Sequence, residues 1–507
     1  MHYPNEKTVA IIGAGPAGLV SARWLAQHGF EPIVFEASER LGGQWNPAAE
    51  ASATWAGMRT NTSRVMSAFS DLDHESDVAT YPRQDQMLAY LERYADRFGL
   101  VRRIQFGKRI ELLESAPDGR WRIRSRTGEG MVEETFSHIV VATGAQARPL
   151  VPEIPGVESF TGALGIAHTS QYEGPERYRN HAVVVAGCSI SALEIASDLA
   201  YGGARVTSAY RRQRYIVPKL IAGVPAEHVL FNRAAALALE ALPPEALAEG
   251  LKAAVLKASG SPDQFGAPVP AGNIFAAGVS QSQGFLPAVA EGRIIVRPWI
   301  ERIDGSTVLF SDGSHARPDA ILFGTGYGLS LPWLDPAIAR ALNFDGTSLD
   351  LYANTFHPDL KGLAFVGLCN LVGPYLPVME LQARWIAYVL AGHVAMPSRA
   401  RMEQGLEACR AMRERGQQPV LHELAVSLAR HAGVEPDLER WPHLERALLF
   451  GPLSPVSFRL QGTDRLEDAP ARTRAAAEAF GAIRSSTFTP EELHLRRLLE
   501  EHASVSP

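Results

Sequence analysis

Two glycine-rich turns are the parts of this sequence best suited to hold a phosphate group. The first, Gly13 to Gly18, follows the β-branched run Thr8–Ile12 and precedes a stretch with helical patterning. A second strand-like run, Glu31–Phe35, leads directly into Glu36. In such a βαβ unit the helix N-terminus binds a pyrophosphate, and an acid about 20 residues further on binds a ribose hydroxyl. The unit predicts a dinucleotide site with contacts from Gly13, Gly15, Pro16, Ala17, Gly18 and Glu36.

A second unit of the same kind follows further along the chain. Ala182–Ala186 predicts a buried strand, and Gly187–Ala192 predicts the turn that opens a helix. Where an acid would favour NAD, this unit carries Arg211 and Arg212. Arginines at this edge bind a 2′-phosphate through bidentate hydrogen bonds, which favours NADPH; a solvated basic turn is the alternative interpretation. The predicted contacts are Gly187, Ser189, Ser191, Glu194, Arg211 and Arg212.

Two dinucleotide sites in one chain indicate hydride transfer between the two, from NADPH to a flavin. Ser137–Val141 predicts a further strand that leads into Thr143 and Gly144, and Ala320–Phe323 predicts another that leads into a glycine turn. Turns of this kind bring the backbone close to a cofactor, with an ordinary hairpin as the alternative. Thr143 and Gly144 are therefore candidate cofactor contacts.

Composition excludes several other classes of protein. The 507 residues are 46% hydrophobic and 21% charged, with a net charge of −6, which argues against nucleic acid or an anionic membrane as partner. The three cysteines, Cys188, Cys369 and Cys409, form no CxxC, and the 15 histidines show no HExxH spacing, so no metal site is expected. Met1–Lys7 is polar, and no apolar stretch reaches the roughly 20 residues of a membrane span. We expect a cytoplasmic protein.

Six segments together resemble the flavin-containing monooxygenases, a group that includes the Baeyer–Villiger monooxygenases. The resemblance covers about residues 8–395, and the segments occur in the family's order. They are Leu41–Trp45 (GGxW), Thr60–Ser63, Phe160–Tyr172 (FxGxxxHxxxY), Gly187–Ala192 (GxSxS-small), Phe323–Tyr327 (ATGY) and Glu380–Trp385 (ELQARW). Several positions depart from the pattern. His168 follows Gly162 after five residues where the motif has three, Ser189 replaces a glycine, Glu194 stands where aspartate or glutamine is usual, and Gly324 replaces an alanine.

The resemblance implies bound FAD, reduction by NADPH, and capture of O₂ as a C4a-(hydro)peroxyflavin. When protonated, this species oxygenates nitrogen or sulfur; when deprotonated, it adds to a ketone. We expect heteroatom oxygenation of a small organic substrate, with Baeyer–Villiger oxygenation as the alternative; Tyr172 leans away from the commonest Baeyer–Villiger type. The resemblance names Asn61 as the catalytic residue and adds Gly43, Gln44, Trp45, Thr60 and Asn61 to the cofactor contacts.

Other assignments stay open at this stage. A non-catalytic, NADPH-sensing flavoprotein is the alternative from another class, whereas a disulfide reductase would need a paired dithiol. His168 either contacts NADP or braces the domain linker. Glu380 and Arg384 lie near the flavin or form a structural salt bridge. Trp45 and Trp55 either flank the flavin ring or pack in the core.

The elements that position these residues form an α/β fold: two Rossmann-like dinucleotide-binding domains, for FAD and NADP, with a helical C-terminal extension. We assign residues 1–170 and 318–395 to the FAD-binding domain and 171–317 to the NADP-binding domain, with a helical insertion at 226–259 split by Pro243-Pro244. Residues 396–507 form the extension, which we expect to pack on the body; a homodimer interface there is left open. Thr489–Glu492 predicts a capping box that opens the last helix.

Overall fold

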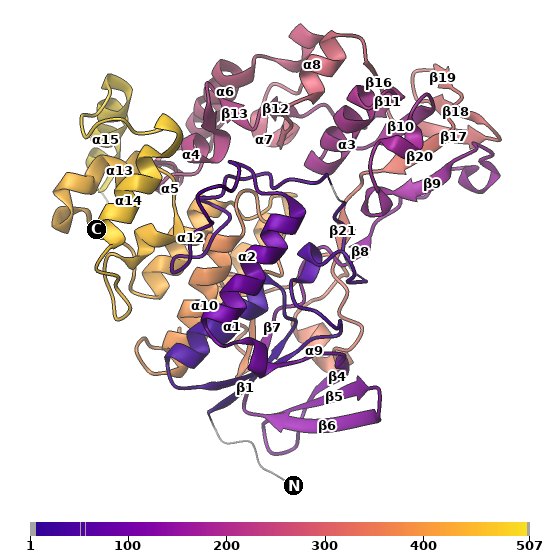
Figure 1. Ribbon diagram of the computed structural model, residues 1–507. Helices are drawn as coiled ribbons and strands as arrows, with labels where there is room; N and C mark the ends of the chain where they lie inside the picture. Colours follow the sequence, from indigo (N-terminus) through magenta and orange to yellow (C-terminus); the bar gives the residue numbers. More distant parts are fainter. Residues whose placement is uncertain (1–6, 51, 56, 504–507) are drawn as a thin grey trace.

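A five-stranded parallel sheet carries the first glycine turn (Figure 1). The computed structural model describes residues 7–50, 52–55 and 57–503. Residues 1–6 of the polar N-terminal run, on which the predicted subcellular location partly rests, lie outside the described residues. The strand order is β22 (Leu363–Phe365), β7 (His138–Val141), β1 (Thr8–Ile12), β2 (Glu31–Phe35) and β3 (Ile104–Gln105). Every neighbouring pair is parallel.

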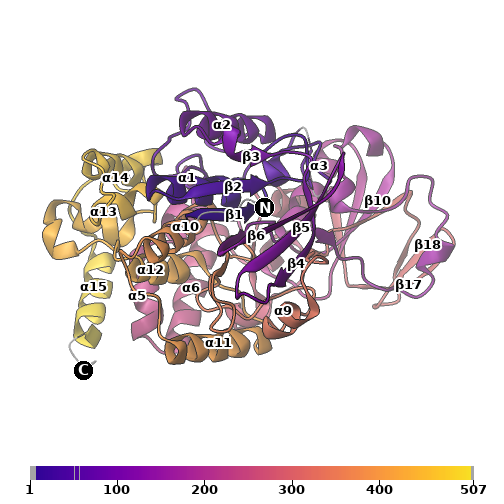
Figure 2. The ribbon, with the colours of Figure 1, turned by 90° about the horizontal axis from the view of Figure 1, so that it is seen from below.

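Both faces of this sheet are covered, which explains why its central strand is buried throughout and apolar from Val9 to Ile12. Val9 and Ile11 pack toward helices α1 (Pro16–Gln27) and α10 (Leu376–Leu390). Ala10 and Ile12 pack toward an antiparallel sheet on the other side. That sheet consists of β4 (Arg109–Ser115), β5 (Trp121–Thr127) and β6 (Gly130–Phe136), which lie toward the viewer in Figure 2. A parallel strand buried on both faces needs an unbroken apolar run.

A second five-stranded parallel sheet carries the second glycine turn. Its order is β16 (Ile294–Arg297), β11 (Arg205–Ala209), β10 (Ala182–Ala186), β20 (Ala320–Phe323) and β9 (Gly165–His168), with α3 (Ile190–Tyr201) against one face. The other face is covered by β17 (Ile300–Asp304) and β18 (Thr307–Phe310), with β19 (His315–Ala316) at their edge. The predicted fold class, with two Rossmann-like units, is confirmed.

Two strands that we assigned to the FAD-binding domain belong to the second sheet. β9 falls within 1–170 and β20 within 318–395, yet both pair in the second sheet, Phe323 with His168 and Ala320 with Val183. The first domain therefore ends before residue 165, and its second part begins after residue 323. The chain passes between the sheets at the antiparallel pair β8 (Arg148–Pro149) and β21 (Tyr327–Gly328). The motifs used to place the boundaries carry no information on this long-range pairing.

The two units differ in where they carry a glycine and where they carry an alanine: the second unit has the larger residue in its helix and the smaller one after its neighbouring strand. Ala142, which follows β7, donates its N–H to Ile12 O, and Gly324, which follows β20, donates to Ala186 O in the same way. At the corresponding positions of the two units, the first has Gly18 in its helix and Ala142 after its strand, whereas the second has Ala192 and Gly324. A Cβ on Gly324 would lie 2.6 Å from the Ala192 Cβ. The departure at Gly324 therefore makes room for Ala192.

Replacing Gly324 by alanine is expected to lower the free energy of unfolding by about 1–3 kcal/mol, because it overfills this contact. In the Gly324→Ala background, Ala192→Gly removes the contact between the two Cβ atoms but leaves the 2.9 Å approach to the Cα of residue 192, so it relieves part of the overlap. Glycine inside a helix itself costs about 1 kcal/mol. The thermal unfolding midpoints of the four proteins in this cycle should therefore show favourable coupling between the two changes. Strictly additive midpoints would contradict the packing explanation.

Helices form the insertion and the C-terminal extension. The insertion contains α4 (Ala226–Leu230), α5 (Arg233–Ala241) and α6 (Pro244–Ser259), followed by α7 (Ile274–Ala277) and α8 (Phe285–Ala290). The extension contains α11 (Arg399–Glu414), α12 (Leu421–His431), α13 (Glu445–Phe450), α14 (Ala469–Glu478) and α15 (Pro490–Ala503). The remaining helices outside short turns are α2 (Gln84–Arg97) and α9 (Pro336–Ala341), and β12 (Tyr215–Val217) pairs with β15 (Val279–Gln281). Thr489 N–H donates to Glu492 Oε2 at 2.7 Å and Glu492 N–H to Thr489 Oγ1 at 3.2 Å, which confirms the predicted capping box.

The extension is joined to the first domain through buried polar contacts. Arg384 in α10 donates to Phe458 O at 2.9 Å, and Arg459 donates to Ser70 Oγ at 2.6 Å. Glu380 accepts from Ser70 N–H at 2.7 Å. Glu380 and Arg384 therefore lie at this junction, not in the cavity described below, and among the described residues the ion-pair partner of Glu380 is Arg459, at 3.9 Å, not Arg384. Of the two alternatives considered, a place near the flavin finds no support, and a structural ion pair is present for Glu380, with Arg459 rather than Arg384 as its partner.

Candidate functional site

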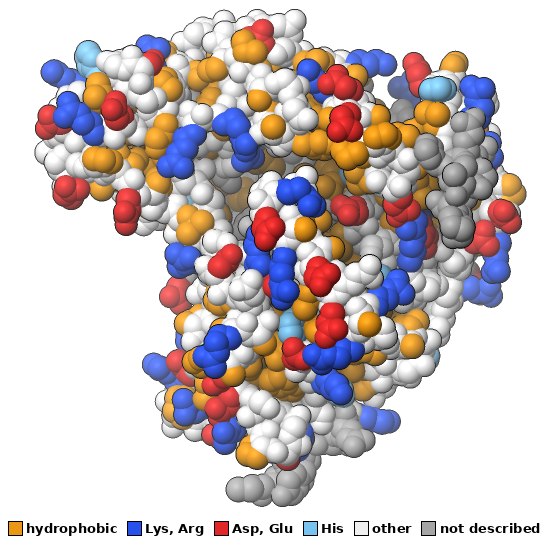
Figure 3. Space-filling model, turned by 180° about the vertical axis from the view of Figure 1, so that it is seen from behind, with side chains coloured by type: hydrophobic (Ala, Val, Ile, Leu, Met, Phe, Trp, Pro, Cys, Tyr) orange, Lys and Arg blue, Asp and Glu red, His pale blue; other side chains and the backbone are white. Residues whose placement is uncertain are grey.

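One cavity of about 2940 Å³ joins the two glycine turns. Pockets for drug-sized ligands measure about 300–1,000 Å³, so this cavity has room for more than one large ligand. The surface in Figure 3 is hollowed between the upper and lower parts of the molecule. The predicted site residues that line the cavity are Gly13, Gly15, Pro16, Ala17, Glu36, Gly43, Gln44, Trp45, Thr60, Asn61, Thr143, Gly144, Gly187, Ser189, Ser191, Glu194, Arg211 and Arg212.

The first turn is shaped to accept a ligand at the start of α1. Gly13 has φ +104°, and a Cβ there would meet Ala142 O at 2.7 Å. Gly18 does not line the cavity; a Cβ there would lie 1.8 Å from Gly13 O, so only glycine lets α1 pack this closely. No side chain caps the helix at Gly15, which leaves its first N–H groups open to an anion.

Glu36 is held in place at the end of β2. Its Oε2 accepts from Ala14 N–H at 2.7 Å, and its Oε1 accepts from Ser38 N–H at 2.8 Å. The side chain is 8% exposed and lies in the cavity wall. These observations fit the adenosine half of FAD, with its pyrophosphate at α1 and its ribose at Glu36.

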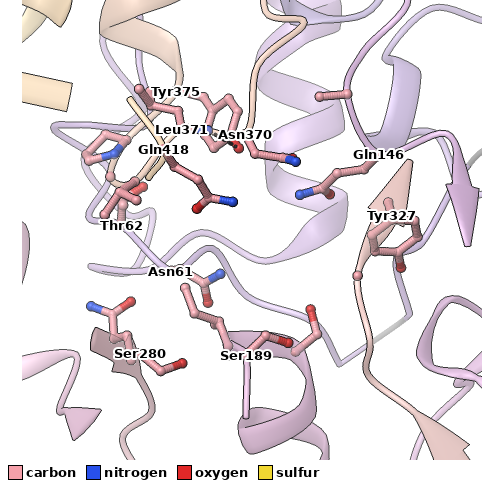
Figure 4. A pocket seen from close by; sticks show the side chains of 18 of the residues that line it. Asn61, Thr62, Gln146, Ser189, Ser280, Tyr327, Asn370, Leu371, Tyr375 and Gln418 are labelled. Atoms are coloured by element: carbon pink, nitrogen blue, oxygen red, sulfur yellow. Dashed lines mark hydrogen bonds between the residues drawn. The ribbon is translucent and has the colours of Figure 1, made fainter. Parts of the chain in front are cut away.

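The residues expected beside the flavin ring converge from three segments. Gly43 lies against Gly15, where an added Cβ would come within 2.9 Å of the Gly15 Cα. The side chain of Asn61 points into the cavity (Figure 4) and has no hydrogen-bond partner within the described part of the chain. Thr143 Oγ1 is buried and also lacks a partner. A polar ring system would satisfy such groups, so the residues present fit FAD.

The second turn has the same construction. Gly187 has φ +134°, and a Cβ there would meet Gly324 O at 2.4 Å. Ser189, at the N-terminus of α3, donates to Gly324 O at 3.1 Å and leaves the helix uncapped. Glu194 forms an ion pair with Lys219 Nζ at 2.7 Å, so its charge is already compensated. An uncapped helix and a glycine cradle fit the pyrophosphate of NADP.

The basic pair lies at the edge of the same cavity. Arg211 stacks over the ring of Trp299, 4.6 Å from its centroid, and Arg212 donates to Ala276 O at 2.5 Å. Both side chains are exposed. The stacked guanidinium of Arg211 has no ion-pair partner among the described residues, so its N–H groups are available to a phosphate.

His168 braces the passage between the two sheets. Its Nε2 lies 3.1 Å from Gly326 O, its Nδ1 lies 3.0 Å from Ser170 Oγ, and its ring meets Tyr327 edge to face. Burial lowers the pKa of His168. His168 does not line the cavity, so the structure agrees with the brace and not with an NADP contact.

The other residues singled out in the sequence have ordinary surroundings. Trp45 and Trp55 both line the cavity, and Trp55 packs edge to face on Tyr172. All three cysteines are free, and burial raises the pKa of Cys188 and raises that of Cys369 to about 12.

No group of three or more His, Cys, Asp or Glu side chains suited to a metal occurs among the described residues. Within residues 7–50, 52–55 and 57–503, no helix combines the length and apolarity that a bilayer crossing needs.

Two residues that line the cavity were not predicted from the sequence. Gln418, from the loop between α11 and α12, points into the part of the cavity that Asn61 lines, beside Thr62 and Asn370 (Figure 4). Glu227, at the start of α4, also lines the cavity. The only sequence signal was a Glu-His pair inside the apolar run of the insertion; nothing in the extension marked Gln418.

Comparison with known proteins gives a consistent result. Residues 6–477 match the family described as flavin-binding monooxygenase-like. Flavin-containing monooxygenase 1 of Homo sapiens is 28% identical, with 91% of each chain covered. Dimethylaniline monooxygenase [N-oxide-forming] 2 of Rattus norvegicus is also 28% identical, with 91% of this chain and 90% of that protein covered.

Two solved structures share the fold. S-allyl-L-cysteine S-oxygenase from Allium sativum matches with TM-score 0.63 and 23% identity over 98% of each chain. Cyclohexanone monooxygenase from Rhodococcus sp. Phi1 bound to NADP⁺ matches with TM-score 0.62 and 17% identity, covering 84% of this chain and 97% of that one.

Proposed function

The chain belongs to the flavin-binding monooxygenase-like family and is a flavin-dependent enzyme that uses FAD, NADPH and O₂, and we propose that it oxygenates small organic molecules at nitrogen or sulfur. The observation that carries the proposal is the single cavity onto which both glycine turns and the unpartnered Asn61 amide open. The reduced flavin supplies the oxygen chemistry when bound. The protein supplies binding and orientation.

The residues divide this work between them. We propose that the first turn and Glu36 hold FAD, and that Gly187, Ser189 and Ser191 hold the NADP pyrophosphate. Asn61 can accept and donate hydrogen bonds without titrating, so it stabilises polar groups at the reacting edge of the ring at any working pH. Glu194, paired with Lys219, shapes the NADP side of the cavity.

Heteroatom oxygenation is better supported than ketone oxygenation. The relatives at 28% identity include one named for N-oxide formation. The cyclohexanone monooxygenase structures share the fold at under 20% identity, so they carry no argument about substrate. A panel of amines, thioethers and ketones of matched size tests the choice, with fragmentation locating the added oxygen. Oxygen on nitrogen or sulfur is expected; turnover of ketones alone to esters would overturn this part of the proposal.

The proposal also covers the subcellular location and the oligomeric state of the protein. We propose a cytoplasmic protein in which the C-terminal extension is the surface for homodimer formation. Light scattering on the purified protein tests whether a dimer forms: about twice the 55.0 kDa of one chain is expected, and the mass of one chain would refute the dimer.

Replacing Arg211 and Arg212 by alanine is expected to erode the preference for NADPH over NADH. Hydrogen bonds to charged groups contribute about 1.5–3 kcal/mol each, so the ratio of kcat/KM for the two cofactors should fall by about tenfold or more. The exposed Arg293, paired with Glu291, is the matched control. An unchanged ratio in the double variant would refute the assignment of these arginines.

A further inference from the structure

Residues 60–67, which we term the Asn61 turn, carry the amide proposed as catalytic. The Asn61 side chain points into the cavity and has no hydrogen-bond partner among the described residues, so its direction depends on the backbone of this turn. Within the turn, Thr62 Oγ1 lies 2.8 Å from Ser67 Oγ, and Ser67 N–H donates to Ser63 O at 2.9 Å. Ser63 is fully buried and does not line the cavity. The contacts that hold Ser63 therefore fix where the Asn61 turn lies.

Two consecutive residues of the insertion hold Ser63. Glu227 Oε1 accepts from Ser63 N–H at 2.5 Å, and His228 Nε2 lies 2.9 Å from Ser63 Oγ. His228 is 1% exposed and does not line the cavity. Its Nδ1 is buried without a hydrogen-bond partner, so within the described part of the chain Ser63 is the one polar partner of this ring. Burial lowers the pKa of His228 to about 4, so the ring is uncharged at neutral pH and the contact does not titrate there.

The extension reaches the same place through Phe480. This residue follows α14, and its ring meets that of His228 edge to face, with 5.4 Å between the ring centroids. The guanidinium of Arg64, the residue after Ser63, lies over the same ring, 5.6 Å from its centroid. Phe480 has φ +59°, in the left-handed region that a bulky residue rarely adopts. Such a strained residue persists only where its surroundings hold it, and here those surroundings include the Asn61 turn and the residue that braces it.

The extension also fixes the chain just beyond the Asn61 turn. Arg472 in α14 donates to Ser70 O at 2.8 Å and pairs with Asp73 at 2.8 Å. Arg459 donates to Ser70 Oγ at 2.6 Å, and Ser70 is 1% exposed. The contacts of Phe480 therefore belong to a set through which the extension holds this stretch of the first domain from outside the cavity.

We propose that His228 and Phe480 are positioning residues for Asn61: the ring of Phe480 holds that of His228, His228 holds Ser63, and the direction of the Asn61 amide follows. Neither His228 nor Phe480 lines the cavity, so neither contacts a substrate there. With the amide misdirected, two electrons from NADPH and two protons convert O₂ to hydrogen peroxide instead of to water and an oxygenated product. The inference rests on the proposed function, because it concerns the residue proposed there as catalytic.

The yield of product per NADPH consumed tests this role, with benzyl methyl sulfide as the substrate. Phe480→Asn removes the ring and keeps a residue that tolerates positive φ. Because a small misplacement at a reacting centre has a large effect, the yield should fall about threefold or more, with a corresponding rise in hydrogen peroxide. The rate at which NADPH reduces the bound flavin without O₂ should change by less than about twofold, because the variant alters neither glycine turn.

Two further variants make the result decisive. His228→Phe keeps a ring against Phe480 and removes the hydrogen bond to the turn, so it should lose yield in the same way, and it carries the test if Phe480→Asn does not fold. Phe488→Asn is the matched control, because this half-buried phenylalanine also lies between α14 and α15 but packs on Phe450; it should give the wild-type yield. In the Asn61→Ala background, neither change should lower the yield further, since no amide is left to position. A wild-type yield in either variant, an equal loss in Phe488→Asn, or losses that multiply with that of Asn61→Ala would overturn the proposal.

Hydrogen exchange separates this inference from the proposed function, because it needs no turnover. In the oxidised FAD-bound protein, peptides that cover the Asn61 turn should exchange about threefold or more faster in Phe480→Asn and His228→Phe than in the wild type, since a lost contact makes local opening easier. Peptides that cover β10 should exchange at the wild-type rate. Unchanged exchange in the Asn61 turn would overturn the positioning role whatever the product yields. If the wild type oxygenates no compound of the panel, the proposed function fails, and the exchange measurement still decides whether Phe480 and His228 hold the turn.

Discussion

Replacing Asn61 by alanine should leave FAD bound and reduce coupled oxygenation by about 10²-fold or more. Loss of a single preorganised hydrogen-bonding group at a reacting centre costs about 10²–10³ in rate. The Asn61 amide points into the cavity and has no partner within the described part of the chain, so its removal disturbs no contact of the fold. The residues proposed to hold FAD, Gly13 and Glu36 among them, lie in other segments. The measurement is the product formed per NADPH consumed, with flavin content determined in parallel.

Asn61→Asp is the second variant in this experiment. It keeps the size of the side chain and replaces the amide donor by an acceptor, so it should also release most of the consumed O₂ as hydrogen peroxide. A wild-type ratio of product to peroxide in the alanine variant would exclude Asn61 as the catalytic residue. Loss of flavin from both variants would assign Asn61 to cofactor binding instead.

The largest expected effect on stability lies at the junction between α10 and the extension. Glu380 is 2% exposed and Arg459 is 3% exposed, and the two are paired at 3.9 Å. Arg459 also donates to Ser70 Oγ and, at 2.8 Å, to Asp464 O. Arg459→Met should lower the free energy of unfolding by roughly 3–5 kcal/mol, because removal of one partner leaves a buried charge uncompensated. Thermal unfolding followed by circular dichroism measures the loss.

The double variant Glu380→Gln/Arg459→Met separates charge from packing. If the uncompensated carboxylate causes the loss, removing its charge should restore a substantial part of the stability. Equal unfolding temperatures for the single and double variants would show that packing and the hydrogen bonds of Arg459, not its charge, stabilise the junction. Lys361→Met on the surface serves as the control for loss of a positive charge.

Local features of the chain were predictable from sequence, and long-range ones were not. The turns at Gly13 and Gly187 are set by a strand, a glycine that needs positive φ and a following helix, all contiguous in sequence. The pairing of β9 and β20 with the second sheet depends on segments more than 130 residues from one another, which no local pattern reports. The domain boundaries therefore shifted while the fold class held.

The candidate site shows the same division. Every residue assigned to the two turns except Gly18 lines the cavity, because a βαβ unit brings its glycine turn, its helix N-terminus and the end of its second strand to one edge of the sheet. Glu227 and Gln418 went unnoticed, because their insertion and extension are brought to the cavity only by tertiary packing. At Glu380 and Arg384 the motif could not decide between a place near the flavin and a structural ion pair, and the packing of the extension decides it: Glu380 pairs with Arg459, and Arg384 donates to Phe458 O.

Isotope labelling tests the central claim most directly. The FAD-bound protein is supplied with NADPH and ¹⁸O₂ together with N,N-dimethylbenzylamine or benzyl methyl sulfide, and the products are analysed by mass spectrometry. We expect one ¹⁸O atom on the nitrogen or the sulfur, with NADPH and O₂ both required. Consumption of NADPH that yields labelled hydrogen peroxide and no labelled product with any amine, thioether or ketone of the panel would contradict the assignment as a monooxygenase.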